Sequence, residues 1–326
     1  MNFLIIGLGS IGKRHMKILK NLGDHKVIAL RTGKGKKTEE HDNEIKADSE
    51  IESYSQISDY EIDAALITNP TSLHTDTAIE IAKQGIPIFI EKPLGKNTDR
   101  TDKLLKIVNE KNIPVMMGYN LIFHPCIREM KKLIQEGKIG KVISAKAQFG
   151  TYMPGWHKNE DYKKSYAANT SLGGGAVLTS IHEQNYLTYF FGGVTDVKAM
   201  GTSGNAIEID AEEGVEILLK HQTGVLSNIH LNFFQKPYYR NCQIIGTEGT
   251  LYWDFRIPEV KILTDEKTEV VKKGNDYIEL LDTSYTEQMK HFIEAVKGNK
   301  SPEQGLEQGI ADLKVALKIL KEIGRN

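Results

Sequence analysis

A glycine-rich turn near the start of the chain constrains the fold more than any other feature. The apolar run NFLII (residues 2–6) predicts a buried strand, and residues 11–22 carry a helical pattern. Between them, in GLGSIG, the first glycine allows a tight turn, the second lets the backbone approach a pyrophosphate, and the third lets the helix pack on the strand. The turn therefore predicts a dinucleotide-binding domain. Its expected cofactor contacts are Gly7, Gly9, Ser10, Ile11 and Gly12.

Short β-branched runs continue to alternate with helical patterns as far as residue 120. Strands that read as continuous apolar runs between helices indicate a parallel sheet covered on both faces. Residues 1–120 are therefore expected to form a Rossmann-type, doubly wound α/β domain. The expected strands are 2–6, 26–30, 63–69, 87–93 and 114–120, and the expected helices are 11–22, 73–84 and 98–112.

The pattern changes in residues 121–326, which we expect to form a second, α+β domain with an open sheet. In VLSNIHLNFF (residues 225–234) apolar and polar residues alternate, as in a half-buried antiparallel strand. We expect the C-terminal helices to pack back on the first domain. Further strands are expected at 142–152, 214–221, 239–246 and 249–255, and helices at 125–136, 286–296 and 306–323.

Length and composition limit the function classes. A chain of 326 residues is long for one core, and a formal net charge of -1 provides no field to hold nucleic acid or an anionic membrane. No apolar run is long enough to span a bilayer. The only cysteines, Cys126 and Cys242, lie far apart and outside any metal-ligand spacing. We therefore expect a cytoplasmic protein with a small-molecule substrate and no metal.

The end of the second expected strand bears on the choice of cofactor. An acid commonly binds the ribose 2′-hydroxyl of NAD at this position, but here Arg31 and Thr32 precede a lysine-rich loop. A guanidinium and a hydroxyl bind a 2′-phosphate through charge-assisted hydrogen bonds. NADP(H) is therefore favoured over NAD(H), the alternative being that RTGKGKK (residues 31–37) is a solvated basic loop.

The stretch PIFIEKPLG (residues 87–95) ends an apolar strand in an acid, a base and a proline. Ligands of doubly wound sheets bind at the carboxyl ends of the strands. Lys92 is therefore expected beside the nicotinamide, where it can hydrogen-bond a substrate oxygen and share in proton transfer. The simpler alternative is a strand that ends at the solvent.

These motifs, with TNPTSLH (68–74), GYN (118–120) and GTEGTL (246–251), resemble those of the glucose-fructose oxidoreductase / inositol dehydrogenase / rhizopine catabolism (Gfo/Idh/MocA) family of NAD(P)-dependent oxidoreductases. The resemblance implies a Rossmann domain followed by a large, mostly antiparallel sheet that often mediates homodimers or homotetramers. It also implies that Lys92 is the catalytic lysine. Cofactor contacts implied in the same way are Asn69, Pro70, His74, Glu91, Lys92 and Asn120.

A second family segment is SLGGGAVLTSIHEQNY (171–186), in which His182 matches the family's acid-base histidine. Leu178 stands where the family has an aspartate, which removes an expected partner of the histidine. Leu121 and Ile122 replace the arginines common after GYN, so we do not expect the sugar pocket of the inositol enzymes. The alternative is a structural histidine on a helix.

An aromatic loop, residues 151–175, leads to the helix of His182 and suits the faces of a sugar ring. Its aromatic residues have the alternative of packing the loop on its own domain. Lysines of the loop, with Lys236 and Arg240, suggest an anionic substituent such as a phosphate or nucleotide. The expected substrate contacts are Lys92, Asn120, Trp156, His157, Tyr166 and His182.

The sequence thus predicts an NADP(H)-dependent oxidoreductase that interconverts a secondary alcohol and a ketone on a sugar or sugar derivative. Lys92 polarises the oxygen and His182 assists proton transfer. Two alternatives stay open: a dinucleotide-sensing regulatory protein without chemistry, and a reductase of a non-sugar ligand.

Overall fold

The structure is a computed structural model that describes residues 1–31, 46–156, 161–202 and 205–325. The chain divides into two compact units. The first unit consists of Met1–Gly118 and Tyr285–Ile310, and the second of Tyr119–Ser284 and Ala311–Asn326.

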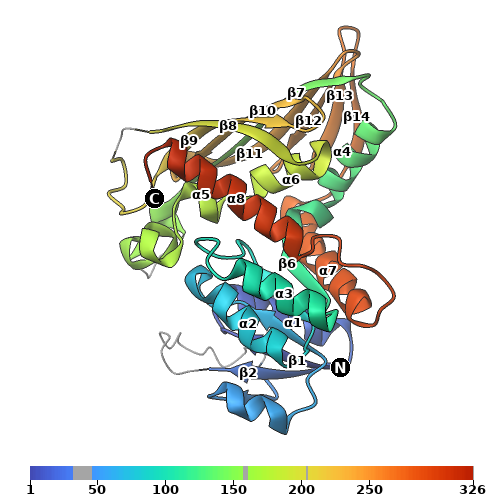
Figure 1. Ribbon diagram of the computed structural model, residues 1–326. Coiled ribbons are helices and arrows are strands. Elements are labelled where there is room, and N and C mark those ends of the chain that lie inside the picture. The colour runs from blue at the N-terminus through green and yellow to red at the C-terminus, as the bar shows by residue number, and fades with distance from the viewer. Residues whose placement is uncertain (32–45, 157–160, 203–204, 326) are drawn as a thin grey trace. The chain divides into compact units, whose positions relative to one another are not determined.

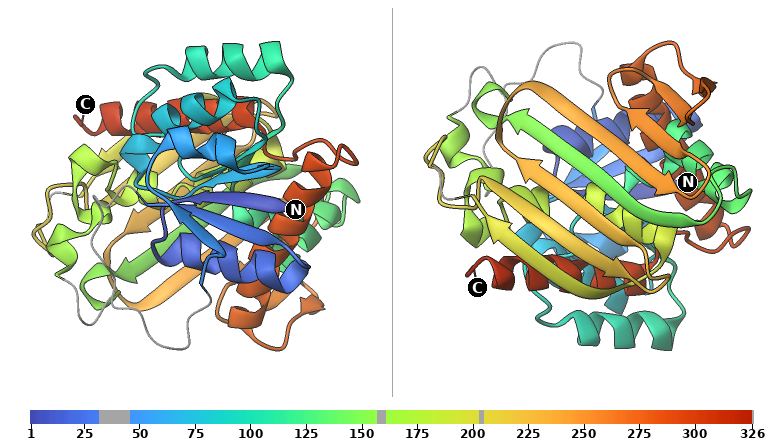
Figure 2. Two further views of the ribbon diagram at one scale, coloured as in Figure 1. Left: turned by 90° about the horizontal axis from the view of Figure 1, so that it is seen from below. Right: turned by 90° about the horizontal axis from the view of Figure 1, so that it is seen from above.

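The first unit contains a fully parallel sheet, in which six strands are described in the order β3-β2-β1-β4-β5-β6. Helix α1 lies on one face, and α2 and α3 lie on the other (Figure 2, left). The elements are β1 (Asn2–Ile6), α1 (Ser10–Leu22), β2 (Lys26–Leu30), β3 (Ser49–Ile51), η1 (Tyr54–Asp59), β4 (Ala64–Ile67), η2 (Thr71–Leu73), α2 (His74–Lys83), β5 (Ile88–Glu91), α3 (Thr101–Lys111) and β6 (Val115–Gly118).

The predicted Rossmann-type architecture is confirmed. The central strands are almost completely buried because helices cover both faces of the sheet, which explains why they read as continuous apolar runs. The chain leaves β1 in one direction along the sheet and returns to β4 on its other side. Ligands of such sheets bind at this reversal, just beyond the carboxyl ends of the strands.

The second unit is built on a sheet whose described strands have the order β14-β13-β12-β11-β7-β10-β9-β8. Every neighbouring pair is antiparallel except β7 and β10, so the expected mostly antiparallel sheet is confirmed. Its strands are β7 (Val142–Tyr152), β8 (Val194–Gly201), β9 (Gly214–His221), β10 (Leu226–Asn232), β11 (Phe234–Gly246), β12 (Thr250–Asp254), β13 (Glu259–Leu263) and β14 (Thr268–Lys273).

One face of this sheet carries helices α4, α5 and α6 (Figure 1), whereas the right-hand view of Figure 2 shows the opposite face without a helix across it. Strand β9 follows this asymmetry, since its residues alternate between buried and exposed. The unit's other elements are η3 (Asn120–Phe123), α4 (Pro125–Gln135), η4 (Met153–Gly155), η5 (Tyr162–Lys164), η6 (Tyr166–Ala168), η7 (Thr170–Leu172), α5 (Ala176–Thr179) and α6 (His182–Phe191).

Two long helices close the chain: α7 (Tyr277–Val296) and α8 (Leu306–Glu322). Helix α7 begins well before the predicted residue 286, because its first turns combine helix-forming Glu and Leu with no breaking residue. In the first unit, the N–H of Met117 on β6 donates to the carbonyl of Gln304. No helix in the described part of the chain is long and apolar enough to cross a membrane.

Candidate functional site

The turn after β1 is shaped by its glycines. Gly7 has φ +101°, and a Cβ on it would lie 2.7 Å from Cα of Asn69. A Cβ on Gly12 would overlap the carbonyl oxygen of Gly7, which Thr68 holds with a hydroxyl hydrogen bond of 2.6 Å. These two positions therefore require glycine for the turn to pack against the end of β4.

Gly9 differs, because a Cβ on it would meet no described heavy atom within 4 Å beyond its chain neighbours. Gly9 is also the N-cap of α1 and supplies no side-chain hydrogen bond, and the first turn of α1 carries no acidic residue. The open space and the available N–H groups at a helix N-terminus suit a pyrophosphate. The turn therefore fits a dinucleotide, with Ser10 exposed and Ile11 half-buried beside it.

At the end of β2, Arg31 does not stand alone. Its Nη1 lies 3.2 Å from Oε1 of Glu50 on β3, and both side chains are partly exposed. A 2′-phosphate would therefore have to bind Arg31 in competition with a carboxylate. Thr32 and the following lysines lie outside the described residues.

A buried histidine ties the turn after β4 to the turn after β5. His74 is 2% exposed, and its Nδ1 lies 2.8 Å from the carbonyl oxygen of Pro93 while its Nε2 lies 2.8 Å from that of Asn69. Burial lowers the pKa of His74, although hydrogen bonds to the two carbonyls raise it. Asn69 in turn donates its side-chain amide to Thr77 at 2.9 Å. Asn69 and His74, two of the expected cofactor contacts, are thus held in place by hydrogen bonds within the protein. Pro70, next to Asn69 in the chain, is exposed.

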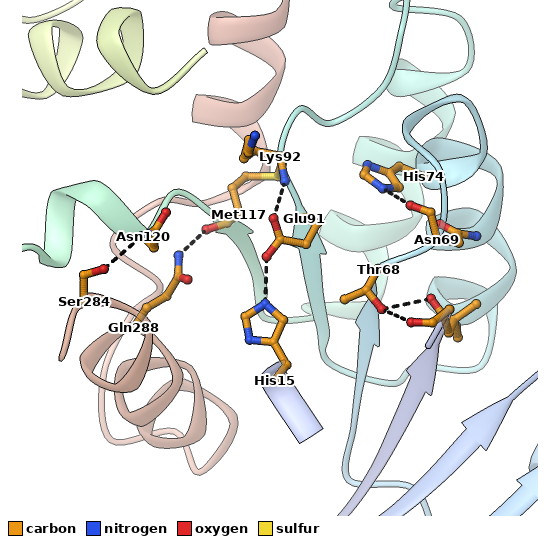
Figure 3. Close-up of polar contacts among 12 residues, drawn as sticks. His15, Thr68, Asn69, His74, Glu91, Lys92, Met117, Asn120, Ser284 and Gln288 are labelled. Atoms are coloured by element: carbon orange, nitrogen blue, oxygen red, sulfur yellow. Dashed lines mark hydrogen bonds and ion pairs between the residues drawn. The ribbon is translucent and has the colours of Figure 1, made fainter. Parts of the chain in front are cut away.

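The EKP segment has the most organised surroundings (Figure 3). Glu91 ends β5 and is 7% exposed; its Oε1 lies 2.7 Å from Nε2 of the fully buried His15 on α1. Its Oε2 accepts the backbone N–H of Lys92 at 3.2 Å. Lys92 is half-buried, and its peptide bond to Pro93 is cis. Glu91 therefore connects His15 of α1 to the backbone of Lys92 through its two carboxylate oxygens.

Sequence reasoning did not single out His15 or Thr68. Each has a signal in retrospect: His15 lies one turn into the helix that the glycine motif opens, and Thr68 lies near the end of the strand predicted at 63–69. Together with the residues above they make one group at the carboxyl end of the sheet, which we call the strand-end site. Its members are Gly7, Gly9, Gly12, His15, Thr68, Asn69, His74, Glu91 and Lys92.

In the second unit, Asn120 and His182 are both buried. Asn120 donates its amide to Ser284 at 2.9 Å, and Ser284 donates its hydroxyl to the carbonyl of Leu281. His182 begins α6, and the ring of Tyr119 lies edge-on to it with centroids 6.4 Å apart. Leu178 lies on the short helix α5, which ends at Thr179, so Leu178 and His182 are on separate helices.

Arg240 does not offer the open anion site suggested by its sequence context. It is 8% exposed, its Nε lies 2.8 Å from Oε1 of the fully buried Glu183, and its guanidinium lies over the ring of Phe149. Burial lowers the pKa of Arg240, but the charges of Glu183, Tyr238 and Tyr186 and a hydrogen bond to Glu183 together raise it above the ordinary value. Lys236 instead lies 3.5 Å from the ring centroid of Tyr152.

The aromatic loop is anchored to its own unit. Trp156 donates its indole N–H to Thr151 at 2.9 Å and packs edge-on against Phe233. Tyr166, another expected substrate contact of the loop, is 41% exposed to solvent. His157 lies outside the described residues. Among the residues that are described, no cluster of histidine, cysteine or acidic side chains is placed to hold a metal ion.

Comparison with known proteins gives two family matches. A model described as an oxidoreductase family with an NAD-binding Rossmann fold matches residues 1–119, and one described as the GFO/IDH/MocA C-terminal domain matches residues 127–252. Myo-inositol 2-dehydrogenase of Thermotoga maritima is 25% identical over 95% of this chain and 92% of its own. Scyllo-inositol 2-dehydrogenase (NAD(+)) of Bacillus subtilis is 25% identical over 91% of this chain and 86% of its own. A structure of levoglucosan dehydrogenase with NADH has the same fold, with a TM-score of 0.84 and 19% identity over 99% of this chain and 97% of that one.

Proposed function

Because the chain belongs to the Gfo/Idh/MocA family of oxidoreductases, we propose that it is an NADP(H)-dependent enzyme that interconverts a secondary alcohol and a ketone on a sugar or sugar derivative. The nicotinamide, when bound, supplies the group that accepts or donates the hydride. The glycine turn, the N-terminus of α1 and Asn69 would hold the dinucleotide. Lys92 and His182 would act on the substrate.

The observation that carries this proposal is the bracketing of Lys92. Its backbone is held by Glu91, which is held by buried His15, and the following Pro93 is held by His74. A lysine fixed in this way at the carboxyl end of a parallel strand is suited to donate a hydrogen bond to a substrate oxygen while charge develops on it. In alcohol oxidation the carbon loses a hydride and the hydroxyl loses a proton, and His182 is the base that takes the proton.

The choice of NADP(H) depends on Arg31. Its guanidinium follows β2, where an acid would repel a 2′-phosphate, and a charge-assisted hydrogen bond to the phosphate would stabilise the complex. Glu50 weakens this argument without reversing it, because a phosphate carries more negative charge than the carboxylate it displaces. The similar B. subtilis enzyme is named for NAD(+), so the preference is a property of this chain to be measured.

A sugar-type substrate is supported by the relatives, which are named as inositol and levoglucosan dehydrogenases. An anionic substituent loses the support of Arg240, since that side chain is committed to Glu183. We further propose a homo-oligomer and the reducing cytoplasm as the compartment, the latter because both cysteines are free thiols.

The test is a substrate panel with the purified 326-residue chain. Myo-inositol, scyllo-inositol, levoglucosan and a phosphorylated and an unphosphorylated hexose would each be mixed with NADP⁺ or NAD⁺, and formation of reduced nicotinamide followed by absorbance. The proposal expects turnover of at least one polyol or sugar. Tight cofactor binding without hydride transfer to any of them would favour the regulatory protein. A parallel panel mixes aromatic and linear non-sugar carbonyl compounds with NADPH or NADH, and turnover in that panel alone, seen as loss of reduced nicotinamide, would favour the non-sugar reductase.

A further inference from the structure

A buried carboxylate lies in the second unit, within the last helix of the chain. Asp312 on α8 is 1% exposed. Its Oδ2 accepts the side-chain amide of Asn185 at 2.8 Å, and its backbone carbonyl accepts the side-chain amide of Gln184 at 2.8 Å. Two consecutive residues of α6 thus hold the same residue of α8, although the segments are more than a hundred residues apart in the sequence.

The same carboxylate is connected to Tyr119. Burial holds the pKa of the Tyr119 phenol well above its ordinary value, and the charge of Asp312 and a hydrogen bond to it raise that pKa further. The Tyr119 phenol is therefore neutral, and the charge of Asp312 acts on it. The ring of Tyr119 also contacts that of His182 edge-on, at an interplanar angle of 81°.

The helix geometry adds a second connection. Residues three apart lie on the same face of an α-helix, so Asn185 and His182 share one face of α6. Asp312 is thus linked to the surroundings of His182 by its hydrogen bond from Asn185, and its charge acts on Tyr119, whose ring contacts His182. We call His182, Tyr119, Asn185 and Asp312 the histidine cluster.

Resting on the proposed function, in which His182 accepts the substrate proton, we infer that Asp312 is a positioning residue that fixes His182 through Tyr119 and Asn185 and stabilises its protonated form. A carboxylate buried in a medium of low dielectric favours a nearby imidazolium much more than one in water does. The two amide donors and the phenol hold Asp312 in place, so its charge is already oriented when the proton arrives.

The other charged groups around α6 and α5 have partners outside the histidine cluster. The Glu183 charge is balanced by Arg240 of β11, and Glu212 accepts the N–H of Val177 at the start of α5. The buried side chains of β7 and β10 are largely apolar. Two basic side chains of α4 contact the C-terminal end of α6. Arg128 donates to the hydroxyl of Tyr189, and Lys131 donates to the backbone carbonyls of Tyr189 and Phe190.

The experiment measures the pKa of His182 directly, by NMR titration of the histidine-labelled, substrate-free protein. The chain has 10 histidines, and the His182 signal is assigned as the one lost in His182→Asn. Asp312→Asn keeps an oxygen acceptor for Asn185 and removes the charge. Asp196→Asn is the matched control, because Asp196 is an exposed aspartate that binds Lys318 of the same helix.

We expect Asp312→Asn to lower the pKa of His182 by about half a unit or more and to move the acid limb of the kcat/KM profile by the same amount, with Asp196→Asn unchanged. Tyr119→Phe, which keeps the ring and removes the hydroxyl, is expected to shift the pKa in the same direction and decides the matter if Asp312→Asn does not fold. A lower melting temperature with an unchanged pKa of His182 would overturn the inference and leave Asp312 a structural residue.

The turnover of His182→Asn separates this inference from the proposed function. Near-wild-type turnover would refute the proton-transfer role of His182, while the effect of Asp312 on the pKa of His182 would still stand or fall by the titration. Loss of turnover in His182→Asn together with an unchanged pKa in Asp312→Asn would retain the proposed function and reject the role of Asp312.

Discussion

The strand-end site and the histidine cluster are built in different ways. In the first unit, the site is made mainly by the backbone: glycines that permit a turn, a helix N-terminus and strand ends that a parallel sheet brings to one edge. In the second unit, the cluster is made by buried side chains from positions 119, 182, 185 and 312. Backbone-built sites leave short contiguous motifs in a sequence, whereas side-chain clusters do not.

Among the differences expected between the two regions, the largest concerns the glycine turn of the strand-end site. Gly9→Ala should leave folding unchanged, because its Cβ enters open space, yet it should weaken cofactor binding by up to roughly a hundredfold, since overpacking a contact costs about 1–3 kcal/mol. Isothermal titration with NADPH and thermal melting measure the two quantities. Gly12→Ala is the contrasting variant and should lower the melting temperature. Unchanged NADPH affinity in Gly9→Ala would contradict the proposal that this turn binds the cofactor.

A buried histidine should make the second unit acid-sensitive. His124 caps α4, its Nδ1 accepting the N–H of Cys126, and burial, aided by the charge of Arg240, lowers the pKa of His124 to about 3. A folded pKa below the unfolded value of 6.5 stabilises the fold above pH 6.5, and this contribution is lost as pH falls toward 3. Between pH 7.5 and pH 5 the loss from this residue is about 2 kcal/mol, or about thirtyfold in the folding equilibrium.

His124→Asn provides the comparison, since asparagine also caps helices but does not titrate. Urea unfolding at several pH values should give a shallower pH dependence of the unfolding free energy for this variant than for the wild type, whatever its absolute stability. Parallel curves for the two proteins would show that His124 is not held neutral.

The smallest effect concerns Arg31 and Glu50. Arg31→Ala should reduce the ratio of NADPH to NADH affinity by about tenfold, because one or two charge-assisted hydrogen bonds to the 2′-phosphate are lost. Glu50→Gln should raise the same ratio by about two- to threefold by removing the competing carboxylate. Fluorescence titrations with both cofactors measure it. Equal binding of NADPH and NADH by the wild type would make NAD(H) an equal candidate.

Much of the fold could be predicted because its signals are local. The glycine turn, the apolar strands and the alternation of residues 225–234 around β10 each lie within a few residues, and the confirmed architecture follows from them. The strands that were missed are β3, β8, β13 and β14. Of these, β3, β13 and β14 are short or rich in charged residues, and β3, β8 and β14 are the outermost described strands of their sheets. Charged strands of this kind occur at sheet edges, where packing rather than the sequence pattern decides pairing.

The site residues, like the strands, could be predicted where their signal is local and could not where it is dispersed along the chain. Gly7, Glu91 and Lys92 stand within recognisable motifs, whereas the partners that hold Glu91 and His182 are dispersed. Neither His15 nor Asp312 could be assigned from spacing, because only the folded chain brings each to its partner. Arg240 shows the converse, since its sequence context suggested an open anion site and the structure buries it against Glu183.

The most direct test of the account is to measure turnover and cofactor affinity on the same variant, Lys92→Ala, with the substrate found in the panel. We predict a fall in kcat of about 10²–10³-fold with the Kd for NADP⁺ within about threefold of wild type, because Lys92 is proposed to act on the substrate oxygen. Lys83→Ala, which removes an exposed lysine of α2 paired with Glu80, should change neither quantity. Near-wild-type turnover of Lys92→Ala would contradict the proposal that Lys92 acts on the substrate oxygen.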